Sequence, residues 1–431
     1  MKNLPILPIV LALIAGLVAP SHGAEKLRVV TTLPDYKFFA EFIGGDRVTV
    51  EAIVQGDQDA HFIRPKPSFV TLVRDADLLI STGLDLELWL PTVVNKSGNT
   101  RVRSGEPGYV AAAQGMKLLE KPKVMSRSEG GVHIYGNPHV NCSPINMKVA
   151  ARNITIGLIK NDPEEKEHYE ANLNNLLDRI DRRLYGDELV EFIGGETLCK
   201  LAEKGTLIPF LKEHEFRDKP LVDYLGGWVG DMMPLRDTPI VTYHKNWVYF
   251  VRLFGLEEAG TVEPKPGIPP PPQHVTDLVE HMRARGIKIL LAANYFDEQK
   301  IRTVADRVGA DAVIVPLYVG GADDVGDYFE LVDFWVDGLL DAASRQGIID
   351  KKDSHHHHHD ADRHDDRGDG HHGDKGGHNN GDHREGGHHG DSHKHTGGGD
   401  NVHTISTESE QAGGGVKRTG GGDHHSRRRL K

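Results

Sequence analysis

The sequence is short of three things that would narrow its function quickly: cysteine, basic charge and long apolar runs. Its two cysteines, Cys142 and Cys199, are too few and too widely spaced for a structural zinc site. The formal net charge of −12 argues against a general nucleic-acid-binding protein, which would carry a basic patch. Beyond residue 24 no apolar stretch reaches the length of a membrane span, so we expect a soluble mature protein with no membrane insertion.

The first residues have the order of a secretory signal peptide. Lys2 precedes an apolar stretch from Leu4 to Val18, and small residues lead up to Ala24. We therefore predict that residues 1–24 are removed and that the mature protein works in the periplasm. An oxidising compartment would allow Cys142 and Cys199 to pair, and their geometry decides whether they do.

Histidine is concentrated at the other end of the chain. Seventeen of the 26 histidines lie in residues 351–431, and His355 to His359 are consecutive. Neutral imidazole suits zinc, copper and nickel, and tracts of this composition are typical of metal-binding segments. The same residues are rich in Gly and Asp and nearly lack large apolar side chains, so we expect a disordered metal-binding tail.

Between these ends the pattern is that of an α/β fold. Short apolar segments that read as strands alternate with amphipathic segments, which predicts parallel β-α-β units. The expected strands cover residues 27–33, 48–54, 76–82, 238–243, 287–293 and 312–316. Asp162 and Pro163 mark the start of a long helix, and Asp297 is expected to cap another.

These signals predict two Rossmann-like α/β lobes joined by one long linker helix. The boundaries that we assign are an N-terminal lobe at 25–157, a linker helix at 158–188 and a C-terminal lobe at 189–350. The proline-rich stretch that begins at Glu263 can be neither helix nor central strand, so it is expected to be an extended connector.

Three of the few histidines within these lobes fall in loops next to predicted elements. His61 and His244 follow strands, and His139 precedes a helical stretch. An α/β fold binds ligands at the carboxyl ends of its strands, so the three should gather in the cleft between the lobes. Three neutral imidazoles plus a carboxylate or water would complete a tetrahedral zinc site.

The motifs around these histidines resemble those of the zinc- and manganese-binding proteins that serve bacterial ABC importers. The matching segments are Asp-Ala-His61, Asn-Pro-His139 and Tyr-His244-Lys-Asn-Trp247, and the resemblance covers about residues 25–345. It implies a rigid two-lobed protein that holds a metal between its lobes and docks on a membrane permease. It also implies zinc, because manganese-binding members place a carboxylate where His244 stands.

The resemblance places the fourth ligand in the loop before the last helix. We expect Asp324, with neighbouring Asp323 or a water molecule as the alternatives. The family's zinc branch often carries its histidine-rich stretch ahead of the second histidine motif, but here that interval holds only His133. The C-terminal tail is the candidate replacement.

Several other side chains near these motifs could either bind the metal or have a purely structural or surface role. Cys142 could add a thiolate ligand, but a small buried cysteine is the favoured interpretation. His133 could reach the cleft, but a solvated loop residue is favoured. Glu263 could bind the metal, orient an imidazole or cap a turn. The remaining histidines of the lobes are expected at the surface: His168, His214, His274 and His281.

The sequence thus predicts a binding protein and not an enzyme. It would be a monomer that captures Zn²⁺ as transported ligand and passes it to an inner-membrane permease, while the tail collects or buffers metal. The alternatives are a manganese-selective member of the same family, a periplasmic zinc hydrolase and a metal-storage protein. A hydrolase is disfavoured because no HExxH-type motif accompanies the histidines.

Overall fold

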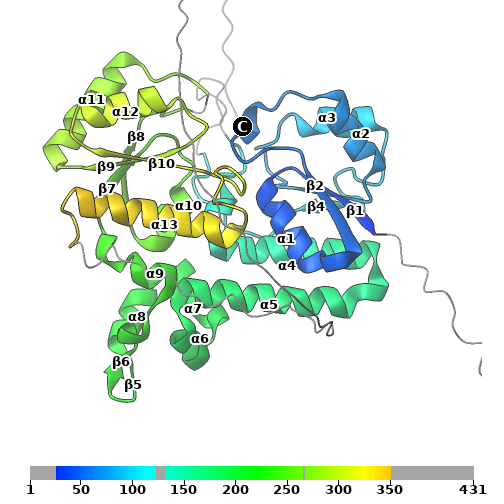
Figure 1. The fold of residues 1–431 in the computed structure, drawn as a ribbon, viewed down its shortest axis with the longest axis horizontal. Coiled ribbons are helices and arrows are strands. Elements are labelled where there is room, and N and C mark those ends of the chain that lie inside the picture. The colour runs from blue at the N-terminus through cyan, green and yellow to red at the C-terminus, as the bar shows by residue number, and fades with distance from the viewer. Residues whose placement is uncertain (1–25, 123–132, 266, 351–431) are drawn as a thin grey trace, which may run out of the picture. The chain divides into compact units, whose positions relative to one another are not determined.

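The computed structural model describes residues 26–122, 133–265 and 267–350. The predicted signal peptide and the predicted histidine-rich tail lie outside these residues. Within them the chain forms two α/β lobes, each built on its own parallel sheet, and the long helix α5 (Lys166–Tyr185) runs beneath them (Figure 1). The predicted fold class of the lobes is confirmed.

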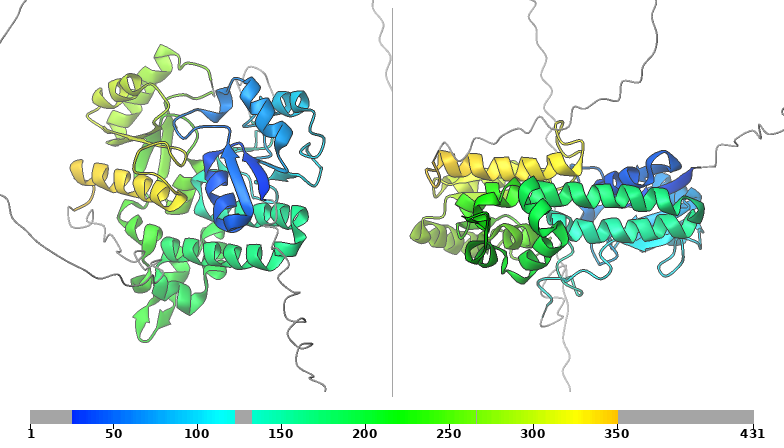
Figure 2. Two further views of the ribbon diagram at one scale, coloured as in Figure 1. Left: turned by 45° about the vertical axis from the view of Figure 1, so that its right-hand side comes forward. Right: turned by 90° about the horizontal axis from the view of Figure 1, so that it is seen from below.

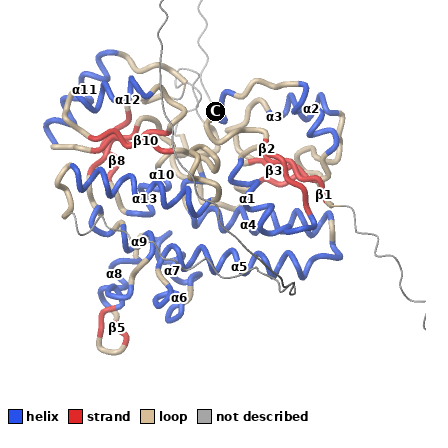
Figure 3. The backbone as a smooth tube through the Cα atoms, in the orientation of Figure 1, coloured by secondary structure: helices blue, strands red, loops and turns tan. Residues whose placement is uncertain are grey.

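The N-terminal lobe is built on a four-stranded parallel sheet with the order β2-β1-β3-β4. The strands of this lobe are drawn in red in Figure 3. Val29 of the central strand β1 pairs with Val50 on one side and Leu78 on the other. Every residue of β3 is buried, as expected for a strand covered on both faces. The elements are β1 (Leu27–Thr31), α1 (Pro34–Gly44), β2 (Val48–Ala52), α2 (Pro67–Asp75), β3 (Leu78–Ser81), α3 (Leu90–Ser97), β4 (Tyr109–Ala111) and α4 (Pro144–Asn161).

The linker differs from the single helix expected over residues 158–188. Residues up to Asn161 belong to α4, a 3₁₀ turn follows at Pro163–Glu165, and only then does α5 begin. Asp162 ends α4 with a non-helical backbone, and its carboxylate accepts a hydrogen bond from Tyr169 instead of capping the next helix. The helices α4 and α5 therefore pack side by side, as the view from below shows (Figure 2).

The C-terminal lobe repeats the parallel sheet with the order β10-β9-β7-β8. Its elements are β7 (Pro239–Thr242), α10 (Val248–Phe254), β8 (Glu257–Thr261), α11 (Pro272–Arg285), β9 (Ile289–Ala293), α12 (Glu298–Asp306), β10 (Asp311–Val315) and α13 (Tyr328–Arg345). Asp297 caps α12 by accepting from the backbone of Lys300, as predicted. Asp327 and Glu330 form a capping box that starts α13.

Short elements between α5 and β7 form a compact group below this lobe (Figure 1). They are α6 (Asp187–Ile193), α7 (Gly195–Lys204), α8 (Leu207–Glu213), a two-residue hairpin β5 (Glu215–Phe216) and β6 (Lys219–Pro220), and α9 (Gly227–Asp231). Cys199 lies in this group and Cys142 lies before α4; both are buried and both are free.

One hydrophobic cluster extends through both lobes and includes Leu79 of β3, Leu291 of β9 and Trp335 of α13. A second cluster, with Val241 of β7 and Leu290 of β9, lies within the C-terminal lobe. At the surface of contact the backbone of Gly56, after β2, touches the backbone of Gly320 and Gly321, so closely that a β-carbon at Gly56 would lie 2.3 Å from both. No helix within the described residues is long and apolar enough to cross a membrane.

Candidate metal centre

His61 is held in a 3₁₀ turn, Ala60–Phe62, that follows β2. Asp59 caps this turn: its Oδ1 accepts from the His61 backbone N–H at 2.9 Å and lies 2.6 Å from Nδ1 of the His61 ring. The indole of Trp89 donates to the carbonyl of Ala60 and anchors the turn on the lobe. These contacts fix both the position of His61 and the direction of its ring.

His139 is fixed in the same way, by an amide in place of a carboxylate. Asn137 Oδ1 accepts from the His139 backbone N–H at 3.0 Å and lies 2.9 Å from its Nδ1. The Asn137 side chain also donates to the carbonyl of Lys245, which follows His244 in the C-terminal lobe, and Tyr249 donates to the Asn137 carbonyl. The loops that carry His139 and His244 are therefore tied together across the lobes.

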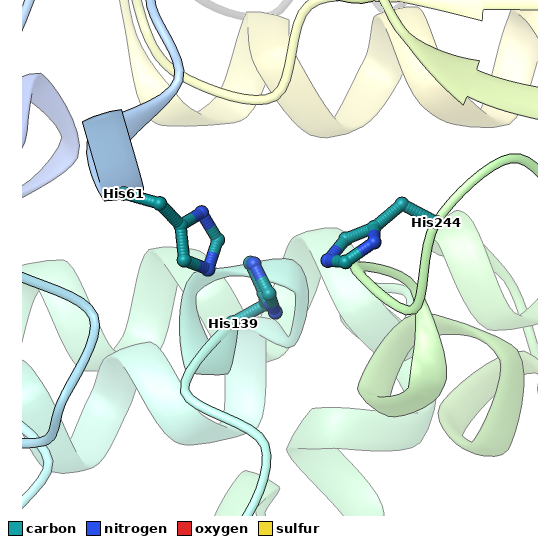
Figure 4. Close-up of side chains that lie close together, drawn as sticks. All are labelled: His61, His139 and His244. Carbon is teal, nitrogen blue, oxygen red and sulfur yellow. The ribbon is translucent and has the colours of Figure 1, made fainter. Parts of the chain in front are cut away.

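The structure brings His61, His139 and His244 into one cluster, as predicted from the sequence. One ring nitrogen of each lies within 4.8 Å of those of the other two. The ring centroids of His61 and His139 are 5.1 Å apart, and His244 lies 5.7 Å from His139 and 6.0 Å from His61. The three rings come from separate segments and converge on one small space (Figure 4).

Burial keeps two of these rings neutral. It lowers the pKa of His139 well below its ordinary value, and the neighbouring histidines act in the same direction. Burial, with a smaller contribution from the nearby His61, likewise lowers the pKa of His244 to about 3. Metal ligation needs the deprotonated ring, so both are ready to bind a cation at neutral pH without first losing a proton.

Two ring nitrogens of the cluster are buried with no hydrogen-bond partner among the described residues: Nε2 of His139 and Nδ1 of His244. Buried polar atoms are nearly always paired, so an orphaned nitrogen needs an explanation. Because Asn137 occupies Nδ1 of His139, the free Nε2 carries the lone pair that a metal ion would use.

Two carboxylates lie next to the Nδ1 atoms of the imidazoles, Asp59 at His61 and Glu263 at His244. Burial opposes ionisation of Asp59, but the hydrogen bonds from His61 outweigh it and lower the Asp59 pKa. Glu263 Oε1 lies 3.8 Å from Nδ1 of His244 and accepts from the backbone of Gly267 at 2.5 Å. The hydrogen bond from Gly267 is the turn-capping role weighed for Glu263, whereas 3.8 Å is too long for a hydrogen bond that would orient the His244 ring. Burial raises its pKa.

The structure does not place Asp324 in this cluster. Backbone hydrogen bonds from Gly320 to Val325 and from Val325 to Ala322 close a tight turn, which leaves Asp323 and Asp324 exposed at its tip. The expected fourth carboxylate is therefore absent from the group that the described residues form.

His133 departs from the interpretation as a solvated loop residue. Its side chain is only 11% exposed, and its Nε2 lies 3.1 Å from Nε2 of His61. Its Nδ1 lies 3.1 Å from Asp85 Oδ1, and the backbone N–H of Ile134 donates to the other Asp85 oxygen. The sequence signal for this contact was slight, a histidine six residues before His139 with no pattern to show that its loop turns back onto Asp85.

The remaining candidates lie outside the cluster. Cys142 is fully buried in the core and is not among the grouped ligands, in keeping with the favoured interpretation. His214 and His281 are exposed, as expected. His168 and His274 are half-buried, since they contact Asn172 and the carbonyl of Thr261 respectively.

A cavity of about 730 Å³ opens beside His61 and His244. One wall is the proline-rich connector at Pro269 and Pro270, and the other is α12 at Val304. This cavity gives the imidazole cluster a route to solvent.

Two α/β lobes with a buried imidazole cluster between them define a metal-binding protein of the solute-binding class.

Comparison with known proteins establishes the family. Residues 29–183 and 229–342 match the family model described as zinc-uptake complex component A, periplasmic, and the chain belongs to this family. Its relatives are substrate-binding proteins of ABC metal importers and not enzymes.

Two relatives illustrate the range of metals. The high-affinity zinc uptake system protein ZnuA of Bacillus subtilis is 22% identical over 335 residues, 75% of this chain and 89% of that protein. The manganese ABC transporter substrate-binding lipoprotein PsaA of Streptococcus pneumoniae is 24% identical over 314 residues, 70% of this chain and 86% of that protein. Relatives at similar distance thus carry different metals in their names.

Solved structures share the fold. A crystal structure of ZnuA superposes with a TM-score of 0.55 at 21% identity, covering 74% of this chain and 99% of that one. A manganese-bound periplasmic metal-binding protein from Candidatus Liberibacter asiaticus gives a TM-score of 0.52 at 18% identity, with 74% and 99% covered. These likenesses concern the fold of the two lobes.

Proposed function

We propose that the protein captures Zn²⁺ in the periplasm and delivers it to the permease of an ABC importer. His61, His139 and His244 are the proposed ligands. The observation that carries the proposal is the convergence of their three ring nitrogens within 4.8 Å, with Nε2 of His139 buried and unpaired. Two nitrogens bound to one tetrahedral zinc ion lie about 3.3 Å apart, so small side-chain movements complete the site.

The chemistry of the donors supports zinc over manganese. Imidazole suits zinc, whereas manganese prefers carboxylate, carbonyl and water oxygens. The Asp59 carboxylate is hydrogen-bonded to Nδ1 of His61, where it orients the imidazole and raises its basicity. Glu263 adds negative charge 3.8 Å from Nδ1 of His244. A manganese-selective protein is the alternative, since PsaA of Streptococcus pneumoniae is about as similar as the zinc protein of Bacillus subtilis.

The two ends of the chain complete the proposal. The signal peptide at residues 1–24 would export the protein, and the tail at residues 351–431 would collect or buffer metal near the cleft. A tethered ligand reaches an effective concentration on the order of millimolar, which raises the local supply of metal.

The decisive experiment is a chelator competition at one equivalent of metal, with zinc and manganese in parallel. We expect tight zinc binding by the mature full-length chain and a loss of more than about 100-fold in His139→Ala. His214→Ala is the matched control, because His214 is exposed and follows α8, outside the two sheets and the histidine cluster. Unchanged zinc affinity in His139→Ala would refute the site, and tighter binding of manganese than of zinc would refute the proposed metal.

A further inference from the structure

The feature that the three-histidine site leaves unexplained is the contact between His61 and His133. Their Nε2 atoms are 3.1 Å apart, and their ring centroids are 5.1 Å apart, the same separation as between His61 and His139. His133 also lies 6.0 Å from His139 between centroids. It is outside the group of three and reaches the group through His61.

In each ring of this pair, a carboxylate contacts Nδ1, the nitrogen that faces away from the other ring. Asp59 faces Nδ1 of His61, and Asp85 faces Nδ1 of His133. An ionised carboxylate only accepts hydrogen bonds, so each Nδ1 must carry the proton. In a neutral ring the other nitrogen then carries a lone pair. Two lone pairs would face each other across 3.1 Å, which is repulsive unless a positive charge lies between them.

A metal ion supplies that charge, and the spacing suits it. The pair is within a few tenths of an ångström of the roughly 3.3 Å expected for two imidazole nitrogens on one tetrahedral zinc ion. The alternative positive charge is one extra proton shared by the two rings. A bound metal ion would displace that proton.

We propose that His133 is the fourth metal ligand and that Asp85 orients it. This inference rests on the zinc site proposed above and deepens it. The site would hold zinc with four imidazoles, His61, His133, His139 and His244, in place of three imidazoles and the Asp324 carboxylate. The side chain of Asp85 is 13% exposed and its second oxygen is bound by the backbone of Ile134, so it holds the His133 ring in one orientation.

An all-nitrogen set has a consequence for selectivity. A site without an oxygen ligand disfavours manganese and keeps the affinity for zinc high, because manganese prefers oxygen donors and zinc accepts nitrogen donors. His133 would then set the preference of this site for zinc over manganese.

The test uses the mature full-length chain with one equivalent of metal. We would compare His133→Ala, Asp85→Asn and the exposed control His214→Ala by chelator competition with zinc and with manganese. Asp85→Asn is expected to weaken zinc binding by about 10–100-fold, the usual effect of removing an orienting partner, and His133→Ala by at least as much. Manganese affinity should change far less, so the ratio of zinc to manganese affinity should fall in both variants.

Cobalt(II) absorption at one equivalent gives a readout that a merely structural role would not move. Replacing an imidazole by water shifts the visible bands, so His133→Ala should change the spectrum and His214→Ala should not. A crystal structure of the zinc-loaded protein should place Nε2 of His133 about 2.0–2.1 Å from the ion. Zinc affinity and cobalt spectrum of His133→Ala that match the control would overturn the inference.

The outcomes also separate this inference from the proposed function. If His139→Ala loses zinc while His133→Ala behaves as the control, the three-histidine site stands and only the fourth ligand is wrong. If neither substitution affects zinc binding, the site as a whole is wrong. Thermal melts of each metal-free variant identify any that fail to fold, and His133→Gln then replaces His133→Ala.

Discussion

The carboxylate of Asp35, at the start of α1, accepts the backbone N–H of Val319 at 2.8 Å, across the boundary between the lobes. Its second oxygen accepts from the side chain of Asn141 at 2.9 Å, and Asn141 also donates to the carbonyl of Leu317. Asn141 lies two residues after His139, so these buried hydrogen bonds fix the segment that carries one of the proposed ligands. Burial raises the pKa of Asp35 to about 7.

Asp35→Asn should therefore change how stability depends on pH. The folded state holds the Asp35 proton up to about pH 7, whereas the unfolded chain releases it near pH 4. The wild-type free energy of unfolding thus loses a contribution on the order of 4 kcal/mol as the pH rises from 4 to 7. The amide of the variant has no such proton. The stability of Asp35→Asn relative to wild type should rise over this range, measured by urea unfolding of metal-free protein at several pH values. A constant difference would contradict the assignment.

Asp59→Asn should weaken zinc binding by about 10–100-fold, because Asp59 fixes the proton on Nδ1 of His61. An amide can donate to Nδ1 and favour the wrong tautomer. Asp57→Asn is the matched control, since Asp57 is exposed two residues earlier. Chelator competition gives the measurement, and equal affinities of the two variants would show that the carboxylate has no orienting role.

Lys148→Met should destabilise the protein by about 3–5 kcal/mol, because it leaves the carboxylate of Asp181 buried without its ammonium partner. Lys148 is fully buried and pairs with Asp181, and Cys199 Sγ lies 3.5 Å from its Nζ. The double variant Lys148→Met/Asp181→Leu removes both charges and should recover most of the loss. Chemical denaturation checks both, and a double variant no more stable than the single one would argue against an ion-pair origin.

Deleting residues 351–431 should lower the number of zinc ions bound and leave one tight site. The tail holds seventeen histidines, whereas the proposed site is built from the lobes. Elemental analysis of full-length and truncated protein, each saturated and then dialysed, gives the stoichiometry. Loss of all tight binding on truncation would show that the tail is the principal site.

Much of the fold could be predicted because its strands are short apolar runs that are buried on both faces. The expected strand at residues 287–293 corresponds to β9 (Ile289–Ala293), in which every residue is buried. By contrast β8 (Glu257–Thr261) was not predicted, because Glu257, Glu258 and Gly260 give it no apolar pattern. The small helices α6 to α9 were also missed, since the contacts that order them are made by distant parts of the chain.

Some residues of the site could likewise be predicted from the sequence and others could not. His61, His139 and His244 could be placed because each adjoins a recognisable strand or helix start. His133 could not, since its position depends on a contact with Asp85, 48 residues away in the sequence. Asp324 was placed by analogy with the family's final loop, but local backbone hydrogen bonds turn that loop outward.

The contact between Gly56 and the pair Gly320–Gly321 sets a mechanical limit on the metal centre. Gly56 lies five residues before His61, and backbone meets backbone there with no room for a methyl group. A single alanine would act as a wedge that holds the lobes apart, and His61 would move away from His244. The separation of the two lobes, and with it the spacing of the metal ligands, thus depends on a glycine that does not itself contact the metal.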